Sequence, residues 1–417
     1  MEKIIIQGRK KISGKVNIAG AKNAALPLMA ASLLVDGWNT FSNVPVLRDI
    51  RTARLLLEHL GVEVKNGKEI QINAKGLHSY TAPYELVKTM RASILVLGPL
   101  LARLKQVKVS LPGGCAIGAR PVDQHLKGFE LMGVKIEIEH GYIKAKTRGL
   151  KGAKIYFDVS TVTGTENLMM AASLAKGTTI LHNAAQEPEV VELAQVLNKM
   201  GAQIDGAGSE VITIEGVSAL KPVTHEIMPD RIEAGTFLVA GALAGGTVEV
   251  APSIPSHLAA LLQKLEEANV KLETKENSIT VKGGGSLKGA NVTTLPFPGF
   301  PTDMQAQFMV LLSLSEGMSA ITETVFENRF IHVSELQRMG ADIEIKGNTA
   351  IVRGVKHLSG ATVMASDLRA SASLILAGLA ARGTTEVTRI YHIDRGYEAI
   401  EEKLRGLGAE LERVKDS

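Results

Sequence analysis

Six long apolar runs recur along the chain, and each is long enough to form a helix. They cover residues 24–34, 92–101, 168–175, 234–244, 306–314 and 370–380. These runs lack the polar stripe of a surface helix, and a helix that is hydrophobic on every side belongs in a core. The pattern therefore predicts six buried helices.

A second pattern follows every apolar run. A glycine, or once an asparagine, ends an amphipathic segment at positions 61, 133, 201, 269, 340 and 408, which are 72, 68, 68, 71 and 68 residues apart. We expect a strand before this segment and a two-stranded hairpin after it, such as residues 341–345 and 350–353. So steady a period predicts one α/β unit that is used six times.

The sixth unit stops before its second hairpin strand, and the start of the chain resembles the missing piece. Residues 5–16 match the pattern of residues 351–362, so the two ends should complete one domain together. Six units divide most simply into three and three. This division predicts one domain of residues 20–229, a second of residues 1–19 and 230–417, and a cleft between them.

The composition fits a globular protein that binds small anions. The 417 residues are 45% hydrophobic and 22% charged, and the net charge of +4 comes from scattered Lys and Arg residues. With 9 Phe, 6 Tyr and 1 Trp, the chain offers little aromatic surface for stacking bases. We therefore expect no nucleic acid partner.

The sequence also predicts a cytoplasmic protein without membrane contact. The apolar run at residues 4–6 is too short for a signal peptide. The uncharged stretch of residues 234–248 is shorter than the roughly 20 residues of a spanning helix. One cysteine excludes an internal disulfide, as is usual in a reducing compartment.

That cysteine, Cys115, lies in a segment whose composition indicates a reactive thiol rather than a buried one. Residues 111–125 contain three glycines and two prolines, a composition typical of a mobile loop. A lone cysteine more often packs as a small buried hydrophobe. Here Arg120 and His125 follow closely, and nearby positive charge would favour the thiolate as nucleophile or proton relay.

Polar residues precede each apolar helix. Helix capping is one explanation for Thr302, Asp303 and Asp367. It does not explain the cations Lys22, Arg91 and Arg369, because positive charge at a helix start opposes the helix dipole. We therefore expect a bound anion near these starts. A second set of polar residues lies at the starts of the amphipathic helices. These residues either form ion pairs at the surface or belong to a binding site. They are Arg48, Asp49, Glu187, Glu189, Arg329, Asp394 and Arg395.

Four motifs carry a resemblance to a known family over essentially the full length. They are Gly-Ala-Lys-Asn-Ala at 20–24, Pro-Gly-Gly-Cys-Ala-Ile-Gly-Ala-Arg-Pro at 112–121, Phe-Pro-Thr-Asp-Met-Gln-Ala-Gln at 300–307 and Glu-Asn-Arg at 327–329. In these motifs the chain resembles the enolpyruvyl transferases that act as UDP-N-acetylglucosamine 1-carboxyvinyltransferases. The resemblance implies an α/β fold of two inside-out α/β barrel domains, each of three units, which close over the substrates.

The resemblance also implies the reaction. The enolpyruvyl group of phosphoenolpyruvate passes to the 3-hydroxyl of UDP-N-acetylglucosamine through a tetrahedral adduct, and phosphate leaves, in the first committed step of peptidoglycan precursor synthesis. By the family pattern, Asp303 is the base near the hydroxyl. Cys115 is the proton donor to the methylene group, a group able to form a covalent adduct, and the target of the antibiotic fosfomycin. Removing one proton and adding another requires two such groups.

The family pattern assigns binding residues as well. Lys22, Arg120 and Arg395 would hold the phosphate, with Arg329 and Arg369 around the carboxylate, because cations stabilise the charge on the leaving group. The positions that match contacts to the nucleotide sugar are Asn23, Arg91, Arg120, Pro121, Val122, Asp123, Gln124, Gly164, Asp303 and Val325. Residues 161–167 stand where Ser-Val-Gly-Ala-Thr is more usual, which leaves the uridine contacts open.

Two alternatives to this function remain. A 5-enolpyruvylshikimate-3-phosphate synthase would share the six units but has no equivalent of the Cys115 loop. A non-catalytic regulator that binds nucleotide sugar would be expected to lose Cys115, Asp303 or Lys22, and the sequence keeps all three. The sequence contains no metal-binding or redox-cofactor motif, so we expect no metal and no cofactor.

Overall fold

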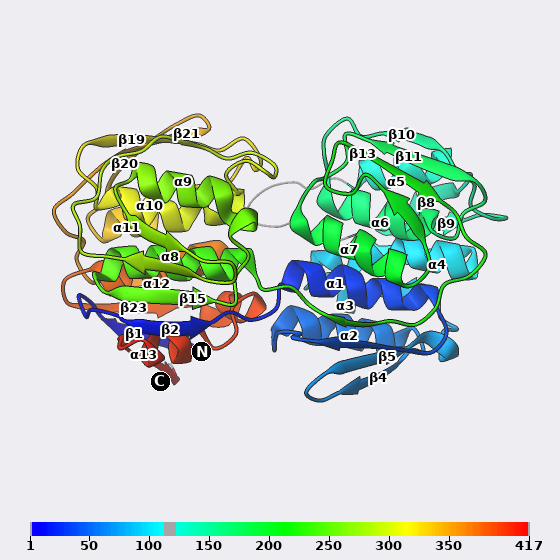
Figure 1. Cartoon of the computed structure of the whole chain (residues 1–417), viewed down its shortest axis with the longest axis horizontal. Coiled ribbons are helices and arrows are strands. Elements are labelled where there is room, and N and C mark those ends of the chain that lie inside the picture. Colours follow the sequence, from blue (N-terminus) through cyan, green and yellow to red (C-terminus); the bar gives the residue numbers. More distant parts are fainter. Residues whose placement is uncertain (1, 112–121, 416–417) are drawn as a thin grey trace. The chain divides into compact units, whose positions relative to one another are not determined.

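The computed structural model describes residues 2–111 and 122–415, and these fold into two compact units (Figure 1). Unit 1 contains the described residues up to Ala19 and from Pro229 onward, and unit 2 contains those from Gly20 to Met228. Each unit has its own hydrophobic core. In the described residues, unit 2 therefore lies between two parts of unit 1 in the sequence.

One sheet of unit 2 illustrates the α/β repeat that the sequence predicts six times. Strand β10 (Lys154–Tyr156) pairs in parallel with β11 (Thr178–His182) across helix α6 (Val162–Ala172). Helix α7 (Pro188–Lys199) then leads to a hairpin of β12 (Gln203–Asp205) and β13 (Val211–Glu215), and β13 pairs with β11. The described residues contain six four-stranded sheets, and all six have this order. The predicted sixfold repetition is confirmed.

The rest of unit 2 follows the same plan. One sheet has the order β14 (Thr224–Glu226), β3 (Trp38–Ser42), β5 (Ile70–Asn73) and β4 (Glu63–Asn66). The other has the order β6 (Thr81–Ala82), β7 (Gln106–Ser110), β9 (Tyr142–Lys146) and β8 (Lys135–Glu139). The helices are α1 (Lys22–Ala31), α2 (Arg48–His59), α3 (Tyr84–Val87), α4 (Leu97–Leu104) and α5 (Asp123–Leu131), with 3-10 turns η1 (Ser32–Leu34), η2 (Ala74–Gly76) and η3 (Arg91–Val96).

Unit 1 contains the remaining sheets. The first has the order β16 (Lys271–Thr274), β17 (Ile279–Lys282), β15 (Thr247–Ala251) and β2 (Gly14–Asn17). The second has the order β18 (Val292–Thr293), β19 (Met318–Thr322), β21 (Thr349–Arg353) and β20 (Asp342–Lys346). The third has the order β22 (Thr362–Met364), β23 (Thr384–Thr388), β1 (Glu2–Gln7) and β24 (Glu410–Lys415). The helices are α8 (Arg231–Ala244), α9 (Ala259–Glu267), α10 (Gln305–Ser313), α11 (Val333–Arg338), α12 (Leu368–Ala380) and α13 (Ile400–Gly406), with 3-10 turns η4 (Pro255–Leu258), η5 (Thr302–Met304) and η6 (Ile390–Arg395).

The apolar helices form the centre of each unit, as predicted. In unit 1, α8, α10 and α12 pack against one another and bury nearly every residue. In Figure 1 they lie between β19 and β21 above and β15 and β23 below. In unit 2 the corresponding helices are α1, α4 and α6. Strands such as β13 alternate buried and exposed residues, so the sheets cover the helices from outside.

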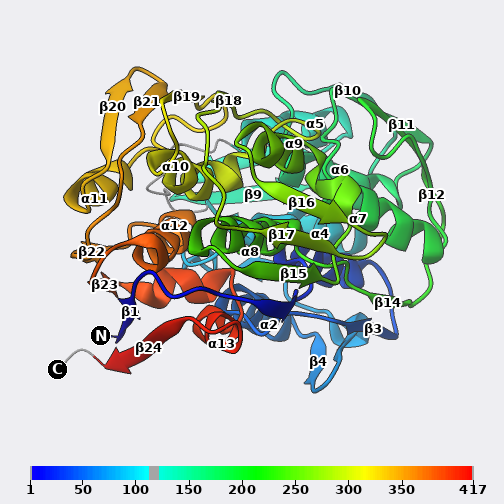
Figure 2. The ribbon, with the colours of Figure 1, turned by 60° about the vertical axis from the view of Figure 1, so that its left-hand side comes forward.

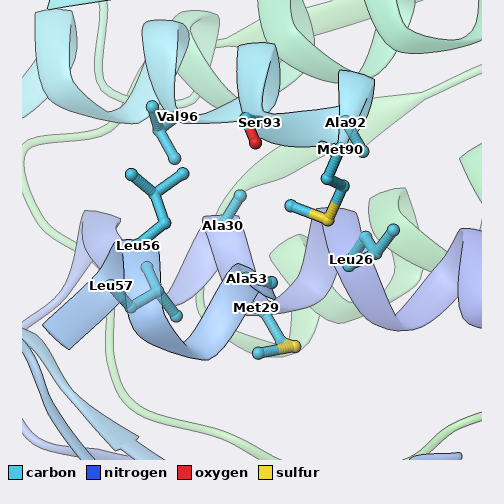
Figure 3. Close-up of a pocket in the computed structure, with 10 residues that line it drawn as sticks. All are labelled: Leu26, Met29, Ala30, Ala53, Leu56, Leu57, Met90, Ala92, Ser93 and Val96. Atoms are coloured by element: carbon cyan, nitrogen blue, oxygen red, sulfur yellow. The ribbon is translucent and has the colours of Figure 1, made fainter. Parts of the chain in front are cut away.

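The core of unit 2 contains one small cavity between α1, α2 and η3 (Figure 3). Its volume is about 20 Å³. Its lining is apolar except for the hydroxyl of Ser93: Leu26, Met29, Ala30, Ala53, Leu56, Leu57, Met90, Ala92, Ser93 and Val96.

The start of the chain completes two sheets of unit 1. Strand β1 lies between β23 and β24, where Ile4 pairs with Val387 and Arg413 (Figure 2). This confirms that the chain start supplies the strand that the sixth unit lacks. Strand β2 adds to β15 in a different sheet. Among the described residues, no helix has the length and apolar content needed to cross a bilayer.

Candidate active site

Asp303 of unit 1 lies in η5, directly before α10, and its carboxylate binds two arginines. Its Oδ1 accepts a hydrogen bond from Arg329 Nη2 at 2.6 Å, and its Oδ2 accepts one from Arg369 Nη2 at 2.6 Å. The arginine side chains are 4% and 7% exposed, whereas that of Asp303 is 28% exposed. Two buried cations thus hold one accessible carboxylate, and the cluster keeps a net positive charge that attracts anions.

A buried polar network supports Arg369 from behind. Arg369 Nη1 donates to the hydroxyl of Tyr397 at 3.3 Å. That hydroxyl also accepts from Gln307 Nε2 at 3.2 Å and lies 2.9 Å from Thr236 Oγ1. Burial opposes the charged form of Arg369, but Asp303, Tyr397 and Asp230 together outweigh it and raise the pKa of the guanidinium. Arg369 is therefore fixed in position and in charge.

The polar residues that precede the apolar helices have different roles, and only some of them cap a helix. Asp367 caps α12, because its Oδ1 accepts from the backbone nitrogens of Arg369 and Ala370 at 2.9 and 3.1 Å. Capping is thus the correct explanation for Asp367. It is wrong for Asp303, since η5 has no side-chain cap, and for Thr302, whose hydroxyl donates to Glu323 Oε2 at 2.9 Å.

Two further predicted residues lie in segments near these. Val325 is 37% exposed, and its backbone nitrogen donates to Glu323 Oε1 at 2.8 Å. Arg395 ends η6, two residues before Tyr397. The preceding Asp394 accepts from Arg413 Nη2 at 2.6 Å, so the last strand anchors η6.

In unit 2, Lys22 is the first residue of α1 and is buried. Its Nζ lies 3.1 Å from Oδ2 of Asp49, which is also buried at the start of α2. The charge that the sequence places against the helix dipole is therefore already balanced by a carboxylate. Asn23 follows and is exposed.

Arg91 opens η3 and acts on His125. Burial first, and then the charge of Arg91, lower the pKa of His125 to about 4. The ring is held by Asn167 Nδ2, 3.2 Å from Nδ1, and by Thr163 Oγ1, 3.3 Å from Nε2. His125 is thus neutral at pH 7, and the prediction that its charge favours a thiolate is wrong, because burial and the charge of Arg91 favour the neutral imidazole.

The remaining predicted positions are distributed over α5 and α6. Val122 is the N-cap of α5, and Asp123 is exposed. Gln124 accepts from the backbone nitrogen of Asp158 at 3.0 Å. Gly164 approaches Thr161 so closely that an added Cβ would lie 2.3 Å from Thr161 Cγ2, so a side chain at position 164 would require the Thr161 side chain to shift.

Cys115, Arg120 and Pro121 lie outside the described residues, and the roles predicted for them stay predictions. Sequence reasoning missed Tyr397, Thr236 and Glu323, which no local pattern marks as functional. In residues 2–111 and 122–415, no group of three or more His, Cys, Asp or Glu side chains is arranged to hold a metal ion.

Comparison with known proteins covers the whole chain. The family model described as EPSP synthase (3-phosphoshikimate 1-carboxyvinyltransferase) matches residues 6–404. A relative from Desulfatibacillum aliphaticivorans, named UDP-N-acetylglucosamine 1-carboxyvinyltransferase, is 62% identical over 416 residues. A relative of the same name from Geotalea uraniireducens is 60% identical over 417 residues. Both matches cover 100% of this chain and 100% of the relative.

Solved structures share the fold. The enolpyruvyl transferase NikO from Streptomyces tendae has a TM-score of 0.90 at 24% identity, covering 100% of this chain and 99% of that one. EPSP synthase from Acinetobacter baumannii has a TM-score of 0.78 at 18% identity, covering 99% of this chain and 100% of that one.

Proposed function

Because the chain belongs to the UDP-N-acetylglucosamine 1-carboxyvinyltransferase family of enolpyruvyl transferases, we propose that it transfers the enolpyruvyl group of phosphoenolpyruvate to the 3-hydroxyl of UDP-N-acetylglucosamine. The observation that carries the proposal is the 62% identity to a relative of that name over 100% of both chains. Phosphate is the second product, and the reaction opens peptidoglycan precursor synthesis.

The proposed chemistry is an addition followed by an elimination. The sugar hydroxyl loses its proton and bonds to C2 of phosphoenolpyruvate, while the methylene carbon gains a proton. The adduct then loses phosphate and a proton from the new methyl group, which restores the enol ether. One group must take a proton from oxygen and another must supply one to carbon.

We assign the first role to Asp303 and the second to Cys115. Asp303 suits the role because it is accessible and because Arg329 and Arg369 fix both of its oxygens. An arriving substrate carboxylate would share these two guanidinium groups with it. Lys22, Arg120 and Arg395 are assigned to the phosphate, whose growing charge they would stabilise. Asn23, Arg91, Gly164, Val325 and residues 120–124 are assigned to the nucleotide sugar.

The test is phosphate release from phosphoenolpyruvate in the presence of UDP-N-acetylglucosamine or, separately, of shikimate 3-phosphate. We expect release only with the nucleotide sugar. Asp303→Asn keeps the shape of the side chain but removes the base, and should lower kcat by roughly 10²–10⁴-fold. Cys115→Ala and Lys22→Met should also lose activity.

The matched control is Asp342→Asn. Asp342 pairs with Arg353 Nη1 at 3.2 Å in the same unit, but this pair is exposed on the β20–β21 hairpin. The control should keep full activity. Phosphate release with shikimate 3-phosphate would instead show that the chain is a 5-enolpyruvylshikimate-3-phosphate synthase. If neither acceptor supports phosphate release, but calorimetry shows that the nucleotide sugar binds, the chain is a regulator.

A further inference from the structure

Glu323 is a buried carboxylate that binds four donors from three separate segments of unit 1. It follows β19 and is 4% exposed. Its Oε1 accepts from Thr294 Oγ1 at 2.8 Å and from the backbone nitrogens of Val325 and Phe326 at 2.8 and 3.1 Å. Its Oε2 accepts from Thr302 Oγ1 at 2.9 Å. All four donors are neutral, so this group fastens segments together without an ion pair.

Each end of the Asp303–Arg329 pair is attached to a segment that Glu323 binds. On one side, Thr302 is the residue before Asp303 and opens η5. On the other side, the Phe326 ring lies under the guanidinium of Arg329, 5.3 Å from the ring centre. The same carboxylate therefore fixes the backbone that carries the base and the turn that supports its arginine partner.

We propose that Glu323 is a positioning residue for the nucleotide-sugar side of the reaction. It holds Asp303 through Thr302, and it holds Val325 through the backbone nitrogens of the turn. This inference rests on the proposed function, since Asp303 and Val325 are the residues assigned there to the sugar. Glu323 itself touches no reacting atom in this scheme.

Both oxygens of Glu323 act as acceptors, three times at Oε1 and once at Oε2. A glutamine could keep these contacts, because its carbonyl oxygen would face the three donors and its NH₂ group could donate to the Thr302 hydroxyl. Methionine has a similar volume but no strong acceptor. Glu323→Met therefore detaches both the turn and the start of η5, with little change in volume.

The experiment is steady-state kinetics of the full chain with both substrates varied. For Glu323→Met we expect the kcat/KM for UDP-N-acetylglucosamine to fall roughly 10–100-fold, because a displacement of about 1 Å costs that much. The KM for the sugar should rise, and the KM for phosphoenolpyruvate should change less than about threefold. A purely structural role would lower the active fraction, and hence kcat, without changing either KM.

Glu335→Met is the matched control. Glu335 lies on α11 of the same unit, and its Oε2 accepts from the backbone nitrogen of Met364 at 3.1 Å. Glu335→Met should leave both KM values unchanged. Thr302→Val removes one donor only, and should lower kcat several-fold while the chain stays folded even if Glu323→Met does not.

The outcomes separate the two proposals. If the unaltered chain is inactive with the nucleotide sugar, the proposed function fails. If it is active and Glu323→Met leaves the sugar KM unchanged, the positioning role is overturned. Additive losses in the Thr302→Val, Glu323→Met double variant would also contradict it, because residues that act through one hydrogen bond must be non-additive.

Discussion

Buried carboxylates in this protein differ in how their charge is compensated. Glu323 receives four neutral donors, and Glu233 pairs with Lys403 Nζ at 2.7 Å while accepting from the backbone nitrogen of Ala19. Glu166 in α6 is 1% exposed, and its Oε1 has no hydrogen-bond partner within the described part of the chain. Its carboxylate form is therefore a local cost that the rest of unit 2 must offset.

Glu166→Gln should stabilise the protein at neutral pH. Burial, with added repulsion from Glu189 and Glu187, raises the pKa of Glu166 well above its usual value. The folded state then binds the proton more tightly than the unfolded state, so the cost appears as pH rises above about 4.5. We expect a gain of about 1–3 kcal/mol at pH 8 that shrinks toward pH 5.

Urea unfolding at several pH values, compared between the variant and the unaltered chain, measures this difference. Glu215→Gln is the control, because Glu215 is exposed on β13, where it accepts from the Thr178 hydroxyl. It should change stability by less than about 0.5 kcal/mol. A gain from Glu166→Gln that is the same at pH 5 and pH 8 would contradict the explanation.

We expect His125 to make the stability of the protein depend on pH in the opposite direction. Its pKa of about 4 in the folded state lies below the usual 6.5, so the unfolded state takes up the proton first as pH falls. Stability should decline between pH 6.5 and 4, by up to roughly 3 kcal/mol from this residue. His125→Asn should flatten that part of the stability curve, measured by urea unfolding, and an unchanged slope would show that the imidazole is not responsible.

The chemistry of single residues was only partly predictable from sequence. Asp303 and Arg369 were found because they lie in motifs and at helix starts. Tyr397 and Thr236 were not, because their network joins α8, α10, α12 and the segment after η6, and packing alone brings these together. For His125, position in the sequence suggested a charge that burial removes.

At the scale of elements, the repeated unit was predictable where its pattern is long. Buried helices and hairpins follow from apolar runs and from a steady period. The parallel edge strand of each sheet was missed, because strands such as β6 and β18 have two residues each, with one buried. So short an edge strand has no periodicity of its own and depends on the neighbouring strand for its hydrogen bonds.

The cavity between α1, α2 and η3 gives a prediction at this scale. The Ser93 hydroxyl faces apolar side chains (Figure 3) and has no partner within the described part of the chain. A trapped water needs two to four polar partners, which this lining does not offer. Ser93→Ala should therefore raise stability by about 1 kcal/mol, measured as the thermal midpoint of unfolding.

Ser173→Ala is the matched control. Ser173 is equally buried, but its hydroxyl donates to the carbonyl of Met169 at 3.0 Å in α6. This change should be neutral or destabilising. Equal effects of the two substitutions would show that the unpaired hydroxyl of Ser93 carries no cost.

At the scale of the whole molecule, the two units differ in how the chain builds them. The described residues of unit 2 all lie between Gly20 and Met228, and β14, near the end of this range, completes the sheet that contains β3. Unit 1 is assembled from both ends of the chain. Its inner strand β1 hydrogen-bonds to two neighbours, so without it two strands of that sheet lose a partner each.

This difference predicts how fragments behave. Residues 20–228 contain a complete core and all partners of their described strands, so they should fold alone and unfold cooperatively, as measured by circular dichroism. Residues 230–417 lack β1 and β2 and should stay unfolded. Glu2 pairs with Lys415, so fusing residues 1–19 directly after Ser417 should create a β24–β1 hairpin. This hairpin would match those of the other α/β repeats, such as β12–β13. We expect the fused fragment to fold. A stable fragment of residues 230–417 without the added strands would contradict this account, because it would mean that the core formed by α8, α10 and α12 needs no contribution from the start of the chain.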